Sequence, residues 1–174
     1  MPALPCDTHD PAGPDGVIDA VVDRLGRLDH LVNLIAAPPR PGRLTELDPL
    51  ALRGALDRHL VMPLAWTRSA CRRRLAEHGG SVVNVVTDAV RDASQAAATA
   101  ALTELTEWLS AELEPRVAVR TVVPSPSTSA AAYRTALTDA VPRLLARPGG
   151  EAAHRVHGPV LVLTAPPERP SHAA

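Results

Sequence analysis

The chain has 174 residues, a length that fits one compact domain, and all 18 of its basic residues are Arg. Its formal net charge of −1 gives no support to nucleic acid or an anionic membrane as a partner. No apolar run approaches the roughly 20 residues that span a bilayer, and the first residues are neither basic nor apolar enough for a signal peptide, so we expect a cytoplasmic protein.

The first half of the sequence predicts a helix, a strand and a longer helical stretch. Residues 15–25 place apolar side chains on one helical face, and Gly26 is a typical C-terminal stop. The nearly continuous apolar run at residues 28–36 indicates a strand that is covered on both faces. A helical pattern then runs from Pro49 to about residue 78. Pro63 inside it predicts a break or a kink, so we expect two helices.

The second half alternates strands and helices. Strands are expected at residues 81–86, 117–123 and 159–163, with helices at 94–114 and 133–147 between them. In the Ala-rich helix at 94–114, a stripe of four leucines marks the expected buried face: Leu102, Leu105, Leu109 and Leu113. This order predicts an α/β domain over residues 1–165, with a mainly parallel sheet of about four strands and helices on both faces. The Pro-rich residues 166–174 are expected to form a flexible tail.

Several segments, in their order along the chain, resemble the short-chain dehydrogenase/reductase family. They are DRLGRLDHLVNLIAAP (23–38), HGGSVVNVVT (78–87), TAALTELTEWLSAELEPRVAVRTVVPSP (99–126) and GPVLVL (158–163), and CDTHD (6–10) is similar to the end of the family's third strand. The resemblance implies an incomplete Rossmann-like fold that lacks the first two strands and the glycine-rich turn between strand and helix. That turn holds the cofactor pyrophosphate in the family, so we expect no nicotinamide cofactor to bind this chain alone.

The resemblance also locates the family's catalytic positions. Gln95 stands where the family has its catalytic Tyr, and Thr99 stands where it has the Lys that lowers the pKa of that Tyr. His59 matches the family Asn, and either Thr87 or Val86 matches the Ser. Because the chain contains no Lys at all, no relocated lysine can supply the missing cation.

Two hypotheses remain open from the sequence. The first is a non-redox binding or assembly subunit in actinobacterial secondary metabolism, a setting suggested by a composition typical of GC-rich genomes. The second is a non-redox enzyme, such as a cyclase, dehydratase or isomerase on a polyketide-like substrate, with His59, Asp88 and Tyr133 as candidates for proton transfer. Candidate substrate-binding residues near the inferred mouth of the site are Asn33, Thr87, Arg91 and Gln95. No cofactor-binding or metal-ligating residues are predicted.

The partner prediction also rests on the resemblance. The family dimerises through the two helices that match residues 63–78 and 94–114, so we expect a homodimer, or a heterodimer with a full-length reductase, through these helices. A small-molecule or acyl ligand is compatible with both hypotheses. Without the family's first strands, residues 28–36 are left at a sheet edge, where unpaired backbone groups favour association with another segment.

Overall fold

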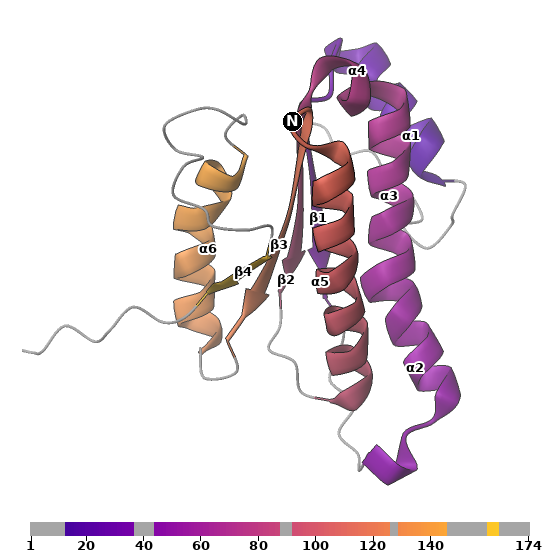
Figure 1. The fold of residues 1–174 in the computed structure, drawn as a ribbon, viewed down its shortest axis with the longest axis vertical. Helices are drawn as coiled ribbons and strands as arrows, with labels where there is room; N and C mark the ends of the chain where they lie inside the picture. Colours follow the sequence, from indigo (N-terminus) through magenta and orange to yellow (C-terminus); the bar gives the residue numbers. More distant parts are fainter. Residues whose placement is uncertain (1–12, 37–43, 88–91, 126–128, 146–159, 164–174) are drawn as a thin grey trace, which may run out of the picture.

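A computed structural model describes residues 13–36, 44–87, 92–125, 129–145 and 160–163. Strands alternate with helical segments along the chain (Figure 1). The elements are α1 (Gly13–Leu25), β1 (His30–Ile35), η1 (Leu44–Glu46), a helical stretch from Pro49 to His78, β2 (Gly80–Val86), α5 (Ala93–Leu113), β3 (Val117–Pro124), α6 (Ala130–Leu144) and β4 (Val160–Leu163).

The four strands form one parallel sheet in the order β1-β2-β3-β4. Figure 1 shows α1, α3 and α5 on one face of this sheet and α6 on the other. The predicted α/β class, with a parallel sheet of about four strands and helices on both faces, is therefore confirmed. The predicted tail at residues 166–174 lies outside the described residues.

Apolar side chains fill the space between the sheet and the helices on each face. The larger cluster lies under α1 and the helical stretch, and its buried members are Ile18, Val22, Ala70, Cys71, Leu75, Val82, Val117 and Val119. The cluster under α6 consists of Val83, Val85, Val122, Tyr133 and Leu144. Each fully buried Val or Leu contributes about 1.5–3 kcal/mol, so these two layers hold the helices against the sheet.

The prediction that Pro63 separates two helices is wrong, because the backbone remains helical from Pro49 to His78. The stretch consists of α2 (Pro49–Leu56), the π-helical η2 (Asp57–Val61), α3 (Met62–Ala70), the π-helical η3 (Cys71–Leu75) and α4 (Ala76–His78). Proline has no N–H, and its ring clashes with the carbonyl four residues earlier in a regular α-helix. The π segment immediately before α3, closed by the Met62 N–H on the Asp57 carbonyl, widens the helix where Pro63 enters.

Helix α5 begins one residue earlier than expected and buries a different stripe. The side chain of Asp92 caps it by accepting a hydrogen bond from the Gln95 N–H at 2.9 Å. Of the four predicted leucines Leu102 is fully buried, and Leu109 and Leu113 are partly buried against the core. The smaller residues Ala98, Thr106 and Ser110 are buried as well. Small side chains let the helix approach β3 closely.

Within the described residues no helix, α5 included, combines the length and hydropathy needed to cross a bilayer.

Strand β1 lies at the edge of the sheet, and the expectation that both of its faces are covered is wrong. The face toward α3 is partly buried, but on the opposite face Val32 is 39% exposed and Leu34 is 72% exposed. Helix α6 covers the β2 and β3 side of that face, so β1 keeps an uncovered apolar surface.

Candidate functional site

The candidate residues that the structure describes lie toward the carboxyl ends of the parallel strands, where open α/β sheets bind their ligands. Asn33 lies on β1, Thr87 follows β2, Gln95 lies in the first turn of α5, and His59 lies on η2. Two further candidates, Asp88 and Arg91, lie outside the described residues. Tyr133 lies on α6 and therefore reaches the sheet from the opposite face.

Thr87 connects the end of β2 to the end of β1 through two hydrogen bonds. Its N–H donates to the Ile35 carbonyl at 2.9 Å, and its hydroxyl donates to the same oxygen at 3.1 Å. The Thr87 hydroxyl, at a position similar to that of the family's Ser, therefore donates its hydrogen bond to the backbone.

His59 is almost completely buried, with 3% of its surface exposed, and neither ring nitrogen has a hydrogen-bond partner among the described residues. Burial lowers the pKa of His59, the neighbouring Arg58 lowers it further, and the carboxylate of Asp92 acts in the opposite direction. These causes favour a neutral imidazole at physiological pH. A neutral imidazole is a competent proton acceptor, but no described carboxylate hydrogen-bonds to it and orients it.

The positions that match the family's Tyr and Lys are buried in α5. Gln95 is 5% exposed and Thr99 is 8% exposed, and the Thr99 hydroxyl has no described hydrogen-bond partner. Neither side chain carries a phenol or a cation. These positions therefore lack both the proton donor of the family pair and the cation that lowers the pKa of that donor. None of the described glycines follows a described strand and opens a helix, and the described residues therefore do not fit a dinucleotide cradle.

Tyr133 is a core residue in this structure. Its hydroxyl donates to the Val86 carbonyl at 2.6 Å, and burial raises the pKa of the phenol well above its ordinary value. A proton held in this way, on a side chain that is 2% exposed, has no access to a substrate at the strand ends. The geometry therefore argues against Tyr133 as an acid or base.

Sequence reasoning missed a polar network that crosses the sheet beneath the candidate site. The amide of Asn33 donates to Asn84 Oδ1 at 2.8 Å, and Asn84 Nδ2 in turn donates to Thr121 Oγ1 at 3.3 Å. The hydroxyl of Thr106 donates to the Leu102 carbonyl at 2.7 Å, so Thr121 is the donor in the 2.6 Å contact between Thr121 and Thr106. Asn84 and Thr121 interrupt otherwise apolar strands, a signal in the sequence that points to buried hydrogen bonding.

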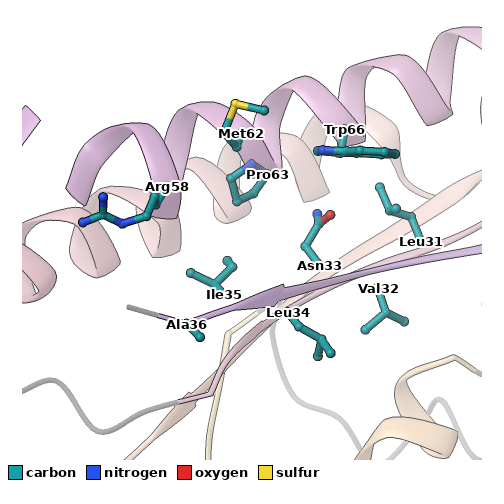
Figure 2. A pocket seen from close by; sticks show the side chains of 10 residues that line it. All are labelled: Leu31, Val32, Asn33, Leu34, Ile35, Ala36, Arg58, Met62, Pro63 and Trp66. Carbon is teal, nitrogen blue, oxygen red and sulfur yellow. The ribbon is translucent and has the colours of Figure 1, made fainter. Parts of the chain in front are cut away.

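A cavity of about 460 Å³ runs along β1, and it too was missed. Figure 2 shows its lining: all six residues from Leu31 to Ala36 on one side, with Arg58, Met62, Pro63 and Trp66 on the helical stretch on the other. Among the predicted site residues that the structure describes, Asn33 alone lines it. Within the described part of the chain, no group of three His, Cys, Asp or Glu side chains has a geometry that holds a metal ion.

Comparison with known proteins identifies the family. The family model described as enoyl-(acyl carrier protein) reductase matches residues 1–147. The chain belongs to the short-chain dehydrogenase/reductase family. The resemblance derived from the sequence segments is thereby confirmed, while a search of curated proteins finds no match.

Several solved structures share the fold of this chain. A short chain dehydrogenase from Mycobacterium smegmatis is 24% identical, with a TM-score of 0.73 over 93% of this chain and 69% of that chain. A citronellol catabolism dehydrogenase from Pseudomonas aeruginosa is 20% identical, with a TM-score of 0.73 over 92% of this chain and 70% of that chain. A halohydrin dehalogenase is 19% identical, with a TM-score of 0.70 over 87% of this chain and 73% of that chain.

Proposed function

We propose that this chain is a non-redox short-chain dehydrogenase/reductase-like protein that serves as a dimeric binding or assembly subunit in the cytoplasm, within actinobacterial secondary metabolism. The observation that carries the proposal is the pair of buried side chains, Gln95 and Thr99, at the family's Tyr and Lys positions. Reduction of a ketone needs a proton donor whose pKa is tuned by a nearby cation. The engaged hydroxyls of Thr87 and Tyr133 do not replace that donor.

Cofactor binding tests the non-redox part of the proposal. Titration of the purified protein with NADPH by calorimetry is expected to give no binding tighter than millimolar, which corresponds to about −4 kcal/mol. A full-length reductase that is known to bind NADPH, titrated in the same buffer, serves as the positive control for the assay. Ketone reduction by this protein with stoichiometric consumption of NADPH contradicts the proposal.

The assembly part of the proposal is supported by the outer surface of α5. The side chain of Trp108 is 70% exposed there, and the exposed Ala96, Ala97 and Ala100 lie about two to three turns earlier on the same helix. Small side chains allow close helix approach, and an exposed Trp is a typical anchor in protein interfaces. We propose that the dimer contact runs through residues 63–78 and 94–114, either between two copies or with a full-length reductase.

A charged residue in this surface tests the dimer. Trp108→Glu is expected to convert a dimer into a monomer in size-exclusion chromatography with light scattering. Leu50→Glu is a matched control, because Leu50 on α2 is also 70% exposed and lies outside the proposed contact. A protein that is monomeric, and that retains no partner in pull-down experiments from its own host, contradicts the assembly role.

The unpartnered imidazole of His59 favours one alternative, a non-redox enzyme such as a cyclase, dehydratase or isomerase. In that reading His59 is the proton acceptor and Asp88 its acidic counterpart, with Asn33, Thr87, Arg91 and Gln95 around the substrate. His59→Ala and Asp88→Ala distinguish the two functions in a reconstituted pathway. Loss of product with retained folding supports the enzyme, whereas full product formation by both variants excludes this catalytic pair.

A further inference from the structure

The backbone of β1 offers a row of hydrogen-bonding groups at the sheet edge. The Asp29 carbonyl accepts from the Ser81 N–H at 3.0 Å, and the Ile35 carbonyl accepts from the Thr87 N–H at 2.9 Å. Successive residues of a strand direct their backbone groups alternately to the two sides. The odd-numbered residues of β1 therefore pair with β2, and the N–H and C=O groups of His30, Val32 and Leu34 point away from the sheet. No described strand pairs with this side of β1.

The cavity follows this edge along its full length. It is lined by every residue from Leu31 to Ala36, and one side is walled by α3 through Met62, Pro63 and Trp66 (Figure 2). Beyond the edge on the opposite face, Val32 and Leu34 present exposed apolar side chains. Six residues of a strand span about 20 Å at 3.3 Å per residue. The site therefore has the length of a strand, an apolar wall on the α3 face, and exposed apolar neighbours on the opposite face.

The guanidinium group of Arg58 lies at the end of this cavity where β1 ends. Figure 2 shows Arg58 above the end of β1, near Ile35 and Ala36. Its Nε is buried and has no hydrogen-bond partner, and no carboxylate in the described part of the chain forms an ion pair with it. A buried donor of this kind favours an acidic group in whatever occupies the cavity.

We propose that the β1 groove, meaning the cavity lined by residues 31–36 with Arg58, Met62, Pro63 and Trp66, binds an extended segment of a partner polypeptide. The segment adds to the sheet as a further strand beside β1, with about six residues that are apolar on both faces and an Asp or Glu at the Arg58 end. Strand addition of this kind takes its affinity from main-chain hydrogen bonds and its specificity from the side-chain pockets. The inference goes beyond the proposed function, because it concerns strand addition at the sheet edge and not the helix-to-helix dimer contact.

The composition of the terminal segments disfavours this chain as its own occupant. Residues 1–12 contain three prolines, and their proline-free run, CDTHD, is polar. Residues 164–174 contain three more prolines. Proline cannot donate to a ladder, so neither segment supplies six apolar residues that pair along β1. Neither of these two segments therefore fits the groove, and the proposal commits to a segment of another polypeptide.

Fluorescence of Trp66 provides a direct readout. Trp108→Phe leaves Trp66 as the sole tryptophan, inside the groove. The probe is a synthetic octapeptide of six alternating Val and Ile residues followed by two Asp residues. Its binding is expected to shift the Trp66 emission. A control peptide is N-methylated at alternate amides and therefore cannot pair with β1. We expect this control to bind at least tenfold more weakly. Equal binding of the two peptides, or binding of neither, overturns the proposal.

Matched variants of the protein test the same contacts from the other side. Val32→Pro removes an N–H that points away from β2, so circular dichroism should stay unchanged while peptide affinity falls at least tenfold; Val32→Thr keeps the N–H and should bind normally. Arg58→Gln should weaken the Asp-containing peptide severalfold and leave an Asn-containing peptide unaffected. If Val32→Pro instead changes the oligomeric mass, the occupant is a second copy. Decanoate serves as a probe for a small apolar acid. If it shifts the Trp66 emission to saturation only when Arg58 is present, and neither peptide binds, the groove binds a small apolar acid. Either of these two results overturns the proposal.

Discussion

The phenol hydroxyl of Tyr133 on α6 donates a hydrogen bond to the main-chain carbonyl of Val86 at the end of β2, with an oxygen–oxygen distance of 2.6 Å. The same hydroxyl lies 3.5 Å from the Val122 carbonyl on β3. One side chain thus ties α6 to the carboxyl ends of two central strands. The tyrosine that this chain retains stabilises the sheet, on the face opposite to η2 and α5.

Replacing this hydroxyl tests the structural role. Tyr133→Phe is expected to lower the free energy of unfolding by about 1–3 kcal/mol, because it leaves the Val86 carbonyl buried without its donor. Urea unfolding measures the change. Thr138→Val is the control, since its exposed hydroxyl donates to the Arg134 carbonyl within α6, and its loss should change the free energy of unfolding by less than about 0.5 kcal/mol. A Tyr133→Phe protein with unchanged stability and lost function would show that the proton of Tyr133 is used chemically.

The amide pair Asn33–Asn84 is predicted to be strongly coupled. Asn33→Ala and Asn84→Ala each leave the other amide partly unpaired, and Asn84→Ala also removes the donor to Thr121. A double-mutant cycle on unfolding free energies should therefore give a coupling of about 0.5–3 kcal/mol, with Asn84→Ala the more damaging single change. Additive effects of the two substitutions would mean that the 2.8 Å contact does not contribute to stability.

The buried imidazole of His59 predicts a loss of stability in acid. Its pKa is lowered in the folded protein by burial and by Arg58, so the unfolded chain binds its proton first as the pH falls below the ordinary value of 6.5. The contribution of His59 is therefore complete above about pH 6.5 and decreases on acidification through the folded-state pKa. Unfolding free energies at pH 7.5 and pH 5.5 should differ more for the parent than for His59→Gln. Identical pH dependence in both proteins argues against a perturbed His59.

The start of β2 is predicted to require glycine. Gly80 has a φ of +156°, and an added Cβ would lie 2.2 Å from the Asp29 carbonyl oxygen and 2.7 Å from the Leu75 side chain. Gly80→Ala is expected to cost about 3 kcal/mol or more, because it forces β1 and β2 apart where Ser81 pairs with Asp29. Gly16→Ala on α1 is the matched control: an added Cβ there meets nothing within 4 Å and should stabilise by about 0.5–1 kcal/mol. Thermal unfolding of the two variants should shift in opposite directions.

Local patterns in the sequence determined the elements of this protein. Apolar runs located β1, β2, β3 and β4 to within about two residues, and Gly26 ends α1 with a φ of +79° as its position indicated. Asp48 caps α2 by accepting from the Leu50 N–H. These features depend on neighbours within a few residues, so the sequence contains their whole cause. The alternation of strands and helices then determined a parallel sheet, because short connections leave few other arrangements.

Tertiary structure alone decided which side chains face one another. Asn33 and Asn84 are 51 residues apart, and Tyr133 and Val86 are 47 apart, so no local pattern indicates either contact. The burial of Thr106 and Ser110 in place of Leu105 and Leu109 depends on how closely α5 approaches β3. The β1 groove exists because α3 walls one side of a strand whose other side has no described neighbour. A side chain is buried or left exposed by whatever packs across from it, and that partner comes from a distant part of the chain.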